Sequence, residues 1–135
     1  MTDRAEAVCI IVDDDPDVCR IIRHPLQRRG ISAIVCGSTA ELQAALGKVK
    51  PGLIFLDAGL PDTGTVDPFD ALAGVHCNAW IQLISGKSQP ELAELALEGE
   101  DWGLRMLPPL TKPFPNGAIA TVVDLIGSSS TEVAR

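Results

Sequence analysis

Near its middle the chain reads Leu53-Ile54-Phe55-Leu56-Asp57-Ala58-Gly59-Leu60-Pro61, an apolar run that ends in one carboxylate. Four apolar residues after the turn-forming pair Pro51-Gly52 are typical of a fully buried strand. Asp57 falls at the carboxyl end of that strand, which is the edge of an open parallel sheet at which ligands bind. Because a buried carboxylate is costly without partners, we expect other segments to bring polar groups to Asp57.

Apolar runs typical of strands alternate with helical patterns along the rest of the chain. Further strands are predicted at residues 8–12, 31–36, 79–84 and 103–107. Helices are predicted from Pro16 to the turn at Gly30, from Ser38 or Thr39 to Leu46, over residues 69–73, from about Gln89 to Glu98, and over residues 118–126. Five alternations of strand and helix indicate an α/β fold with one parallel sheet and helices on both faces.

Several residues predict where these elements begin and end. Asp15 before Pro16 predicts an N-cap, Pro25 predicts a kinked or tightened helix, and Gly30 predicts the end of that helix. Residues 61–68 and 111–114 are expected to be loops. We expect one domain over residues 1–126, followed by a mobile tail or the start of a linker over residues 127–135.

Composition narrows the class of protein. A length of 135 residues suits one domain, and a net charge of −7 without a block of Lys or Arg argues against a nucleic-acid surface. No apolar run approaches the roughly 20 residues that span a membrane. The polar N-terminus does not resemble a signal peptide. Cys9 and Cys36 fall in apolar strand-like runs, and Cys19 falls in a helical pattern. With Cys77 they are expected to be free thiols, which points to the cytoplasm.

Polar groups follow the other predicted strands at their carboxyl ends. Asp13 and Asp14 follow the first strand, Ser85 follows the fourth, and Lys112 follows the fifth. Since these ends share one edge of a parallel sheet, the side chains are expected to converge on Asp57. Three carboxylates repel one another unless a cation lies among them, and oxygen ligands favour Mg²⁺. The hydroxyl and the ammonium suit an oxyanion such as a phosphoryl group.

This set of side chains predicts a phosphoryl-transfer chemistry. The Asp57 carboxylate can attack a phosphoryl donor and form an acyl phosphate. Mg²⁺, Lys112 and Ser85 are expected to stabilise the charge on the phosphoryl oxygens, and Gly86 leaves space beside them.

Four short motifs carry a resemblance to a known family. They are Ile11-Val12-Asp13-Asp14-Asp15-Pro16, Leu56-Asp57 with Pro61, Leu83-Ile84-Ser85-Gly86 and Thr111-Lys112-Pro113-Phe114. Their identity and order resemble the signatures of response-regulator receiver domains over about residues 7–126. The resemblance implies a doubly wound, three-layered, flavodoxin-like (βα)5 sheet with strand order 2-1-3-4-5.

The resemblance also implies roles for single residues. Asp57 is the implied phosphoacceptor, and Ser85 and Lys112 assist it. The implied Mg²⁺ ligands are Asp13, Asp14, Asp57 and the backbone carbonyl of Gly59, with Asp14 more direct than Asp13. The bond between Lys112 and Pro113 is implied to be cis.

Implied partners follow from the same family. A sensor histidine kinase or a phosphotransfer protein donates the phosphoryl group, and the surface formed by about residues 89–126 then binds an effector or a second copy. The resemblance implies that the chain is not an enzyme beyond its own phosphorylation and slow dephosphorylation. No membrane or nucleic acid is implied for this chain.

Two positions depart from the family pattern. Pro109 stands three residues before Lys112, where the family usually has an aromatic residue that rotates on activation. Gly64-Thr65 stands where Asp-Gly is usual. The segment from Gly103 to Phe114 is similar to receivers attached to cyclic-di-GMP phosphodiesterase domains.

Two other functions stay open. A pseudo-receiver, which keeps the fold but binds partners without phosphorylation, is compatible with Pro109 and with the altered loop at Gly64-Thr65. A haloacid-dehalogenase-like phosphatase is suggested by Asp13 and Asp15 after an apolar strand, but its late acidic motif is met only by Asp124, inside a predicted helix.

Overall fold

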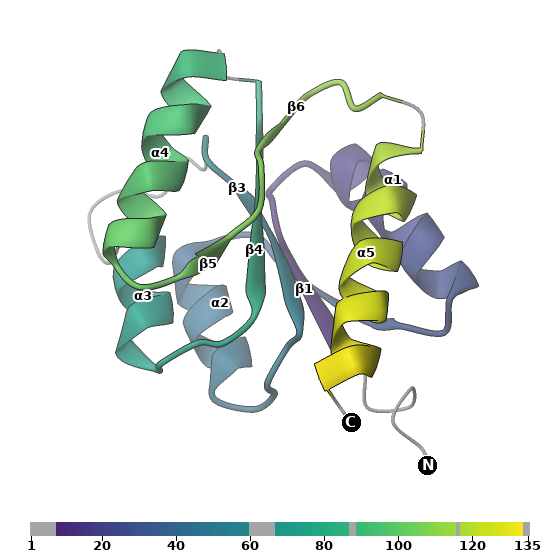
Figure 1. The fold of residues 1–135 in the computed structure, drawn as a ribbon, viewed down its shortest axis with the longest axis horizontal. Helices are drawn as coiled ribbons and strands as arrows, with labels where there is room; N and C mark the ends of the chain where they lie inside the picture. Colours follow the sequence, from purple (N-terminus) through teal and green to yellow (C-terminus); the bar gives the residue numbers. More distant parts are fainter. Residues whose placement is uncertain (1–7, 60–66, 87–88, 116, 134–135) are drawn as a thin grey trace.

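The chain forms a parallel sheet between two layers of helices (Figure 1). The computed structural model describes residues 8–59, 67–86, 89–115 and 117–133, with the backbone alone for residues 89 and 127–133. The strands are β1 (Val8–Val12), β2 (Ser32–Cys36), β3 (Leu53–Asp57), β4 (Trp80–Ser85), β5 (Arg105–Met106) and β6 (Leu110–Thr111). The helices are α1 (Pro16–Arg28), α2 (Thr39–Leu46), α3 (Pro68–Gly74), α4 (Gln89–Asp101) and α5 (Ala118–Val133).

The strands pair in the order β2-β1-β3-β4-β5, and β6 also pairs with β4. Every pairing is parallel. This arrangement confirms the predicted α/β class, the doubly wound order 2-1-3-4-5 and the three layers. The carboxyl ends of β1, β3 and β4 therefore lie at one edge of the sheet.

Apolar side chains fill both faces of the sheet. On one face the buried cluster joins the sheet to α2 and α3, through residues that include Ile10, Ile54, Leu42 and Leu72. On the other face it joins the sheet to α1 and α5, through residues that include Ile11, Phe55, Ile22 and Val123. Both faces of the central strands are covered, which explains why β3 is apolar at every position before Asp57.

The predicted helix starts are confirmed by side-chain caps. The Asp15 carboxylate accepts a hydrogen bond from the Asp17 amide at 2.9 Å, and α1 begins at Pro16. Ser38, rather than Thr39, caps α2 by accepting from the Glu41 amide. Both caps satisfy amides that have no partner within the helix.

Glycine ends two of the helices. Gly30, at φ 73°, follows the last turn of α1, where the amides of Gly30 and Ile31 donate to the carbonyls of Gln27 and Leu26. Gly103, at φ 86°, ends α4 in the same way. This is the Schellman motif, which requires a left-handed residue at that position. Pro25 lies within α1 without ending it.

The predicted fifth strand at residues 103–107 was wrong in its extent. The structure has two short strands instead, β5 and β6, separated by Leu107, Pro108 and Pro109. Proline has no N–H for the ladder, so two adjacent prolines break a strand. Thr111, predicted in a loop, is part of β6.

Three helices are longer than predicted. Pro68 belongs to α3 rather than to the preceding loop, and α4 continues to Asp101 rather than ending near Glu98. The last helix continues to Val133, beyond the predicted end at Ile126. Adding residues to a formed helix costs little, so the polar segment 127–133 can follow the turn before it. The predicted loop residues 61–66 lie outside the described residues, and the domain boundary at 126 stays a prediction.

The remaining predictions concern membranes and thiols. In the part of the chain that the structure describes, none of the helices has the length and apolar character to cross a membrane. All four cysteines are free, as predicted, and Cys9, Cys19 and Cys36 are buried.

The cap of α1 can be tested by substitution. Asp15→Ala should lower the free energy of unfolding by about 1 kcal/mol, because the Asp17 amide loses its acceptor. Asp15→Asn keeps an acceptor oxygen and should retain most of the stability. Urea unfolding in Mg²⁺-free buffer measures both variants, and an equal loss in the two would contradict the assignment of Asp15 as the cap.

Candidate functional site

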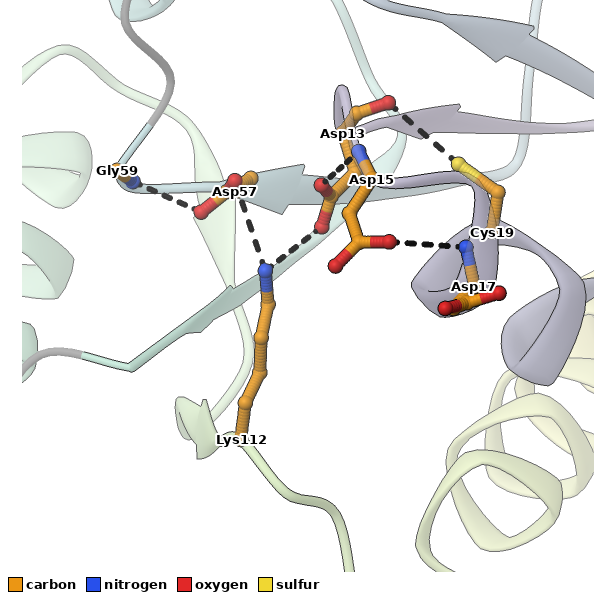
Figure 2. A network of polar contacts seen from close by, with 7 residues as sticks. All are labelled: Asp13, Asp15, Asp17, Cys19, Asp57, Gly59 and Lys112. Atoms are coloured by element: carbon orange, nitrogen blue, oxygen red, sulfur yellow. Dashed lines mark hydrogen bonds and ion pairs between the residues drawn. The ribbon is translucent and has the colours of Figure 1, made fainter.

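The carboxylates of Asp13 and Asp57 lie at the carboxyl ends of the neighbouring strands β1 and β3 (Figure 2). Both residues are buried, with 2% and 7% of their surface exposed. The exposed Asp14 completes a group in which one carboxylate oxygen from each residue lies within 4.8 Å of the others. The convergence predicted for these three residues is therefore found.

Lys112 brings the positive charge to this group. Its Nζ donates a hydrogen bond to Asp13 Oδ2 at 2.8 Å and lies 3.6 Å from Asp57 Oδ2. Figure 2 shows the ammonium between the two carboxylates. The Lys112 amide donates to the Ser85 carbonyl at 2.8 Å, so the pairing of β6 with β4 holds the lysine at this edge. Its bond to Pro113 is cis, as implied by the resemblance.

Backbone amides fix the orientation of the two buried carboxylates. The Gly59 amide donates to Asp57 Oδ1 at 2.8 Å, and the Asp15 amide donates to Asp13 Oδ1 at 2.9 Å. In both residues the Oδ1 atom faces the backbone, which leaves Oδ2 toward Lys112. Each carboxylate is thus held by the turn that follows its own strand.

Ser85 lies beside Asp57 at the end of β4. The Ser85 side chain is buried, and a Cβ placed on Gly59 would lie 3.5 Å from Asp57 Oδ1 and 3.7 Å from Ser85 Oγ. The Ser85 hydroxyl, the Asp57 carboxylate and Gly59 therefore share one side of the site. Gly86, next to Ser85, is exposed and has open space where a Cβ would be.

Burial and charge act in opposite directions on Asp57. Burial raises the pKa of its carboxyl, the Gly59 amide lowers it, the charge of Asp13 raises it and Lys112 lowers it, with a net rise. Burial lowers the pKa of the Lys112 ammonium, but the hydrogen bond to Asp13 and the charges of both aspartates raise it above its usual value. Lys112 therefore stays charged. It pairs with Asp13 and Asp57, while Asp14 adds a third carboxylate to the same group. That imbalance suits a further cation.

Two contacts near the site were missed by the sequence analysis. Cys19 was predicted only as a small buried residue, but its thiol donates to the Asp13 carbonyl at 3.4 Å. Burial and the charge of Asp13 raise the pKa of that thiol, which keeps its proton. The second contact is made by Gln82, whose side-chain amide donates to the carbonyls of Leu83 and Pro108. The sequence analysis gave Gln82 no role. A polar residue within the apolar strand β4 could have indicated such a contact, because buried amides need partners.

Of the two departures from the family pattern, the structure describes the one at Pro109. Pro109 is half-buried and lies between β5 and β6, three residues before Lys112. Gly64 and Thr65 lie outside the described residues. Asp124, considered as a phosphatase residue, lies on α5 and pairs with Arg29, the C-cap of α1, with Asp124 Oδ1 2.6 Å from Arg29 Nε.

Comparisons with known proteins agree with this geometry. Residues 9–124 match the model of the response regulator receiver domain. Transcriptional regulatory protein KdpE of Mycobacterium tuberculosis is 32% identical over 107 residues, which are 78% of this chain and 44% of that protein. The chain thus spans less than half the length of the curated relatives it matches.

Solved structures give the same result. A response regulator receiver protein from Burkholderia phymatum superposes with a TM-score of 0.70 at 28% identity, over 90% of this chain and 95% of that one. A two-component response regulator from Clostridium difficile superposes with a TM-score of 0.72 at 20% identity, over 90% and 96% of the two chains, and shows the fold alone. Attachment to a cyclic-di-GMP phosphodiesterase domain stays a prediction.

The electrostatic balance at Asp57 can be tested with two substitutions of opposite effect. In Mg²⁺-free buffer, Lys112→Met should raise the pKa of the Asp57 carboxyl further, because a positive charge is lost. Asp13→Asn should lower it, because a negative charge is lost. Carboxyl-carbon NMR titration measures both, with the exposed Lys48→Met as the control. Shifts of the same sign in the two variants would contradict the described arrangement.

Proposed function

The chain belongs to the response-regulator receiver family, and from that membership we propose that it is a phosphoacceptor of a two-component phosphorelay, with Asp57 as the acceptor. The observation that carries the proposal is the group at the sheet edge. The Lys112 ammonium lies 3.6 Å from the Asp57 carboxylate, and three carboxylates converge there. Asp57 is the member of this group at the end of the central strand β3.

The proposed step is an in-line transfer from a phosphohistidine of a partner protein. An oxygen of the Asp57 carboxylate attacks phosphorus, a P–O bond forms and the P–N bond breaks. The electron pair of that bond leaves with the imidazole, which takes a proton. The product is an acyl phosphate. Hydrolysis by water then returns the carboxylate and inorganic phosphate. Phosphorylation and this slow dephosphorylation are the only reactions in the proposal.

Lys112 and Ser85 assist this step in the proposal. The Lys112 ammonium balances the charge of the phosphoryl oxygens, and the Ser85 hydroxyl, beside Asp57, donates a hydrogen bond to one of them. Donors held in place before the reaction are worth more than mobile ones, because they need no reorganisation. The short bond from Lys112 to Asp13 provides such a fixed position.

The donor set suits Mg²⁺. Asp13, Asp14, Asp57 and the carbonyl of Gly59 would hold the ion, which supplies charge neutralisation at the phosphoryl oxygens when bound. Support comes from the carboxylate oxygens that lie within 4.8 Å of one another and from the excess of negative charge around one ammonium. Oxygen-only ligands of this kind favour a hard cation.

The proposed output is a change at the surface of α4, β5 and α5. A phosphoryl group adds a charge of about −1.5 to −2 at the site, which shifts this surface between two states. A sensor histidine kinase or a phosphotransfer protein supplies the group in the cytoplasm, and an effector or a second copy binds the surface. Phosphorylation-independent binding would refute the switch and favour the pseudo-receiver, which Pro109 allows.

Phosphorylation can be followed by intact mass. Incubation with acetyl phosphate should add one phosphoryl group in the presence of Mg²⁺ and none in its absence. Asp57→Asn should remove the gain, whereas Asp70→Asn, an exposed acid on α3, should leave it unchanged.

The same experiment separates the alternatives. Phosphorylation of Asp13 in place of Asp57, located by peptide mapping, would favour a haloacid-dehalogenase-like phosphatase. No gain with acetyl phosphate or with a panel of kinases would favour the pseudo-receiver.

The metal assignment has its own test. Asp14→Ala should weaken Mg²⁺ binding at least about tenfold, since even the outer partners of metal ligands contribute about 10–100-fold. Calorimetric titration measures the affinity, and Asp17→Ala, an exposed acid three residues away, is the control. Unchanged affinity in Asp14→Ala would overturn the assignment.

A further inference from the structure

β6, which directly precedes Lys112, is shifted by one residue relative to the register in which β5 pairs with β4. Ile81 of β4 pairs with Met106 of β5, whereas Ile84 pairs with Leu110 of β6. Three positions of β4 are therefore matched by four positions of the outer strand, which is residues 105–111 with β5 and β6 at its two ends. The outer strand contains a one-residue bulge at Leu107, Pro108 and Pro109, a feature that is uncommon between parallel strands.

The bulge decides which way the following side chains point. Side chains alternate along a strand, so residues three apart normally lie on opposite faces. Leu107 and Leu110 nevertheless belong to the same cluster, under α1 and α5. A shift of one residue in the register moves every later side chain of the strand to the opposite face. The bulge therefore sets the side of the sheet edge on which Lys112 stands.

Pro109 also removes one hydrogen bond from the ladder. The Leu107 amide donates to the Ile81 carbonyl, and the Lys112 amide donates to the Ser85 carbonyl. The Ile84 carbonyl points the other way, toward the Ala58 amide of the β3 side. Successive carbonyls of a strand point to alternate sides. The Leu83 carbonyl therefore faces the outer strand, between the hydrogen bonds of the Leu107 and Lys112 amides. Its regular donor would be the amide of residue 109, and proline has none.

The side chain of Gln82 supplies the donor that the Leu83 carbonyl lacks. Its Nε2 donates to the Leu83 carbonyl at 3.1 Å and to the Pro108 carbonyl at 2.7 Å. A carboxamide nitrogen has two hydrogens, which matches the two carbonyls. Only 1% of the Gln82 surface is exposed, so water does not compete for these bonds. One side chain thus joins the two strands across the interruption.

From these contacts we infer that Gln82 is a positioning residue for the proposed phosphoryl transfer. Its carboxamide fixes the shifted register of β6 and thereby holds the Lys112 ammonium against Asp13 and Asp57. The inference rests on the proposed function for its catalytic consequence, but the register itself is independent of it. Gln82 touches neither Asp57 nor Lys112 in this scheme and acts through the backbone of β6.

The first test measures the register without any reaction. In Gln82→Met, which keeps the length of the side chain and removes both donors, hydrogen exchange at the Lys112 amide should become faster. The Leu107 amide, which donates to the Ile81 carbonyl on the β5 side of the two prolines, should exchange at its original rate. Unchanged exchange at Lys112 would overturn the inference, as would a uniform rise at both amides, which signals general loss of stability.

The second test measures phosphorylation by acetyl phosphate with Mg²⁺. Gln82→Met should slow the reaction about tenfold or more, since a displacement of ~1 Å can cost ~100-fold. In a Lys112→Ala background the same substitution should change the rate less than about twofold, because Gln82 acts through the position of the Lys112 ammonium. An equal effect in both backgrounds would overturn the inference.

A restored backbone donor provides the rescue. Pro109→Ala returns an N–H at the position that faces the Leu83 carbonyl, and combined with Gln82→Met it should recover part of the phosphorylation rate and the protection of the Lys112 amide. Pro108→Ala, the matched control, places its N–H elsewhere and should rescue neither. Equal rescue by the two proline substitutions would contradict the assignment of residue 109 as the regular partner of the Leu83 carbonyl. If the wild type gains no phosphoryl group, the proposed function fails, while the exchange measurements still decide the role of Gln82.

Discussion

The repulsion between the buried carboxylates of Asp13 and Asp57 is the constraint on which this sheet edge depends. Two such charges at the ends of adjacent strands require a positive partner. Lys112, which directly follows β6, provides it. β6 pairs with β4 rather than with β1 or β3. The turns after β1 and β3 turn one oxygen of each carboxylate toward the ammonium. The geometry of the site is therefore a property of the whole sheet.

Much of this arrangement could be predicted because it depends on local patterns. A fully apolar run before Asp57 identifies a buried central strand, and the acids after the first strand lie at a matching position. Parallel strands then place these ends at one edge without any further information. Asp15 and Gly30 were also identifiable, since caps are decided by residues within a few positions of the helix end.

The outer strand could not be predicted in the same way. The pair Pro108-Pro109 is visible in the sequence and indicates an interruption, but the register with which the chain resumes depends on contacts with β4. Gln82 was conspicuous as an amide in an apolar strand, yet its acceptor at Pro108 lies 26 residues further along the chain. Helix length was underestimated at α4 and α5, where propagation carries polar residues beyond the apolar pattern.

The interruption of the outer strand has a consequence at the opposite side of that strand. Because the Leu107 amide points to β4, alternation directs the nitrogen of Pro108 outward, to the free edge of the sheet. A proline there removes a donor, and the bulge bends the line of the remaining ones. Such an edge is a poor template for a strand from another molecule. The broken outer strand therefore protects this edge of the sheet, opposite β2, against pairing with a strand from another molecule.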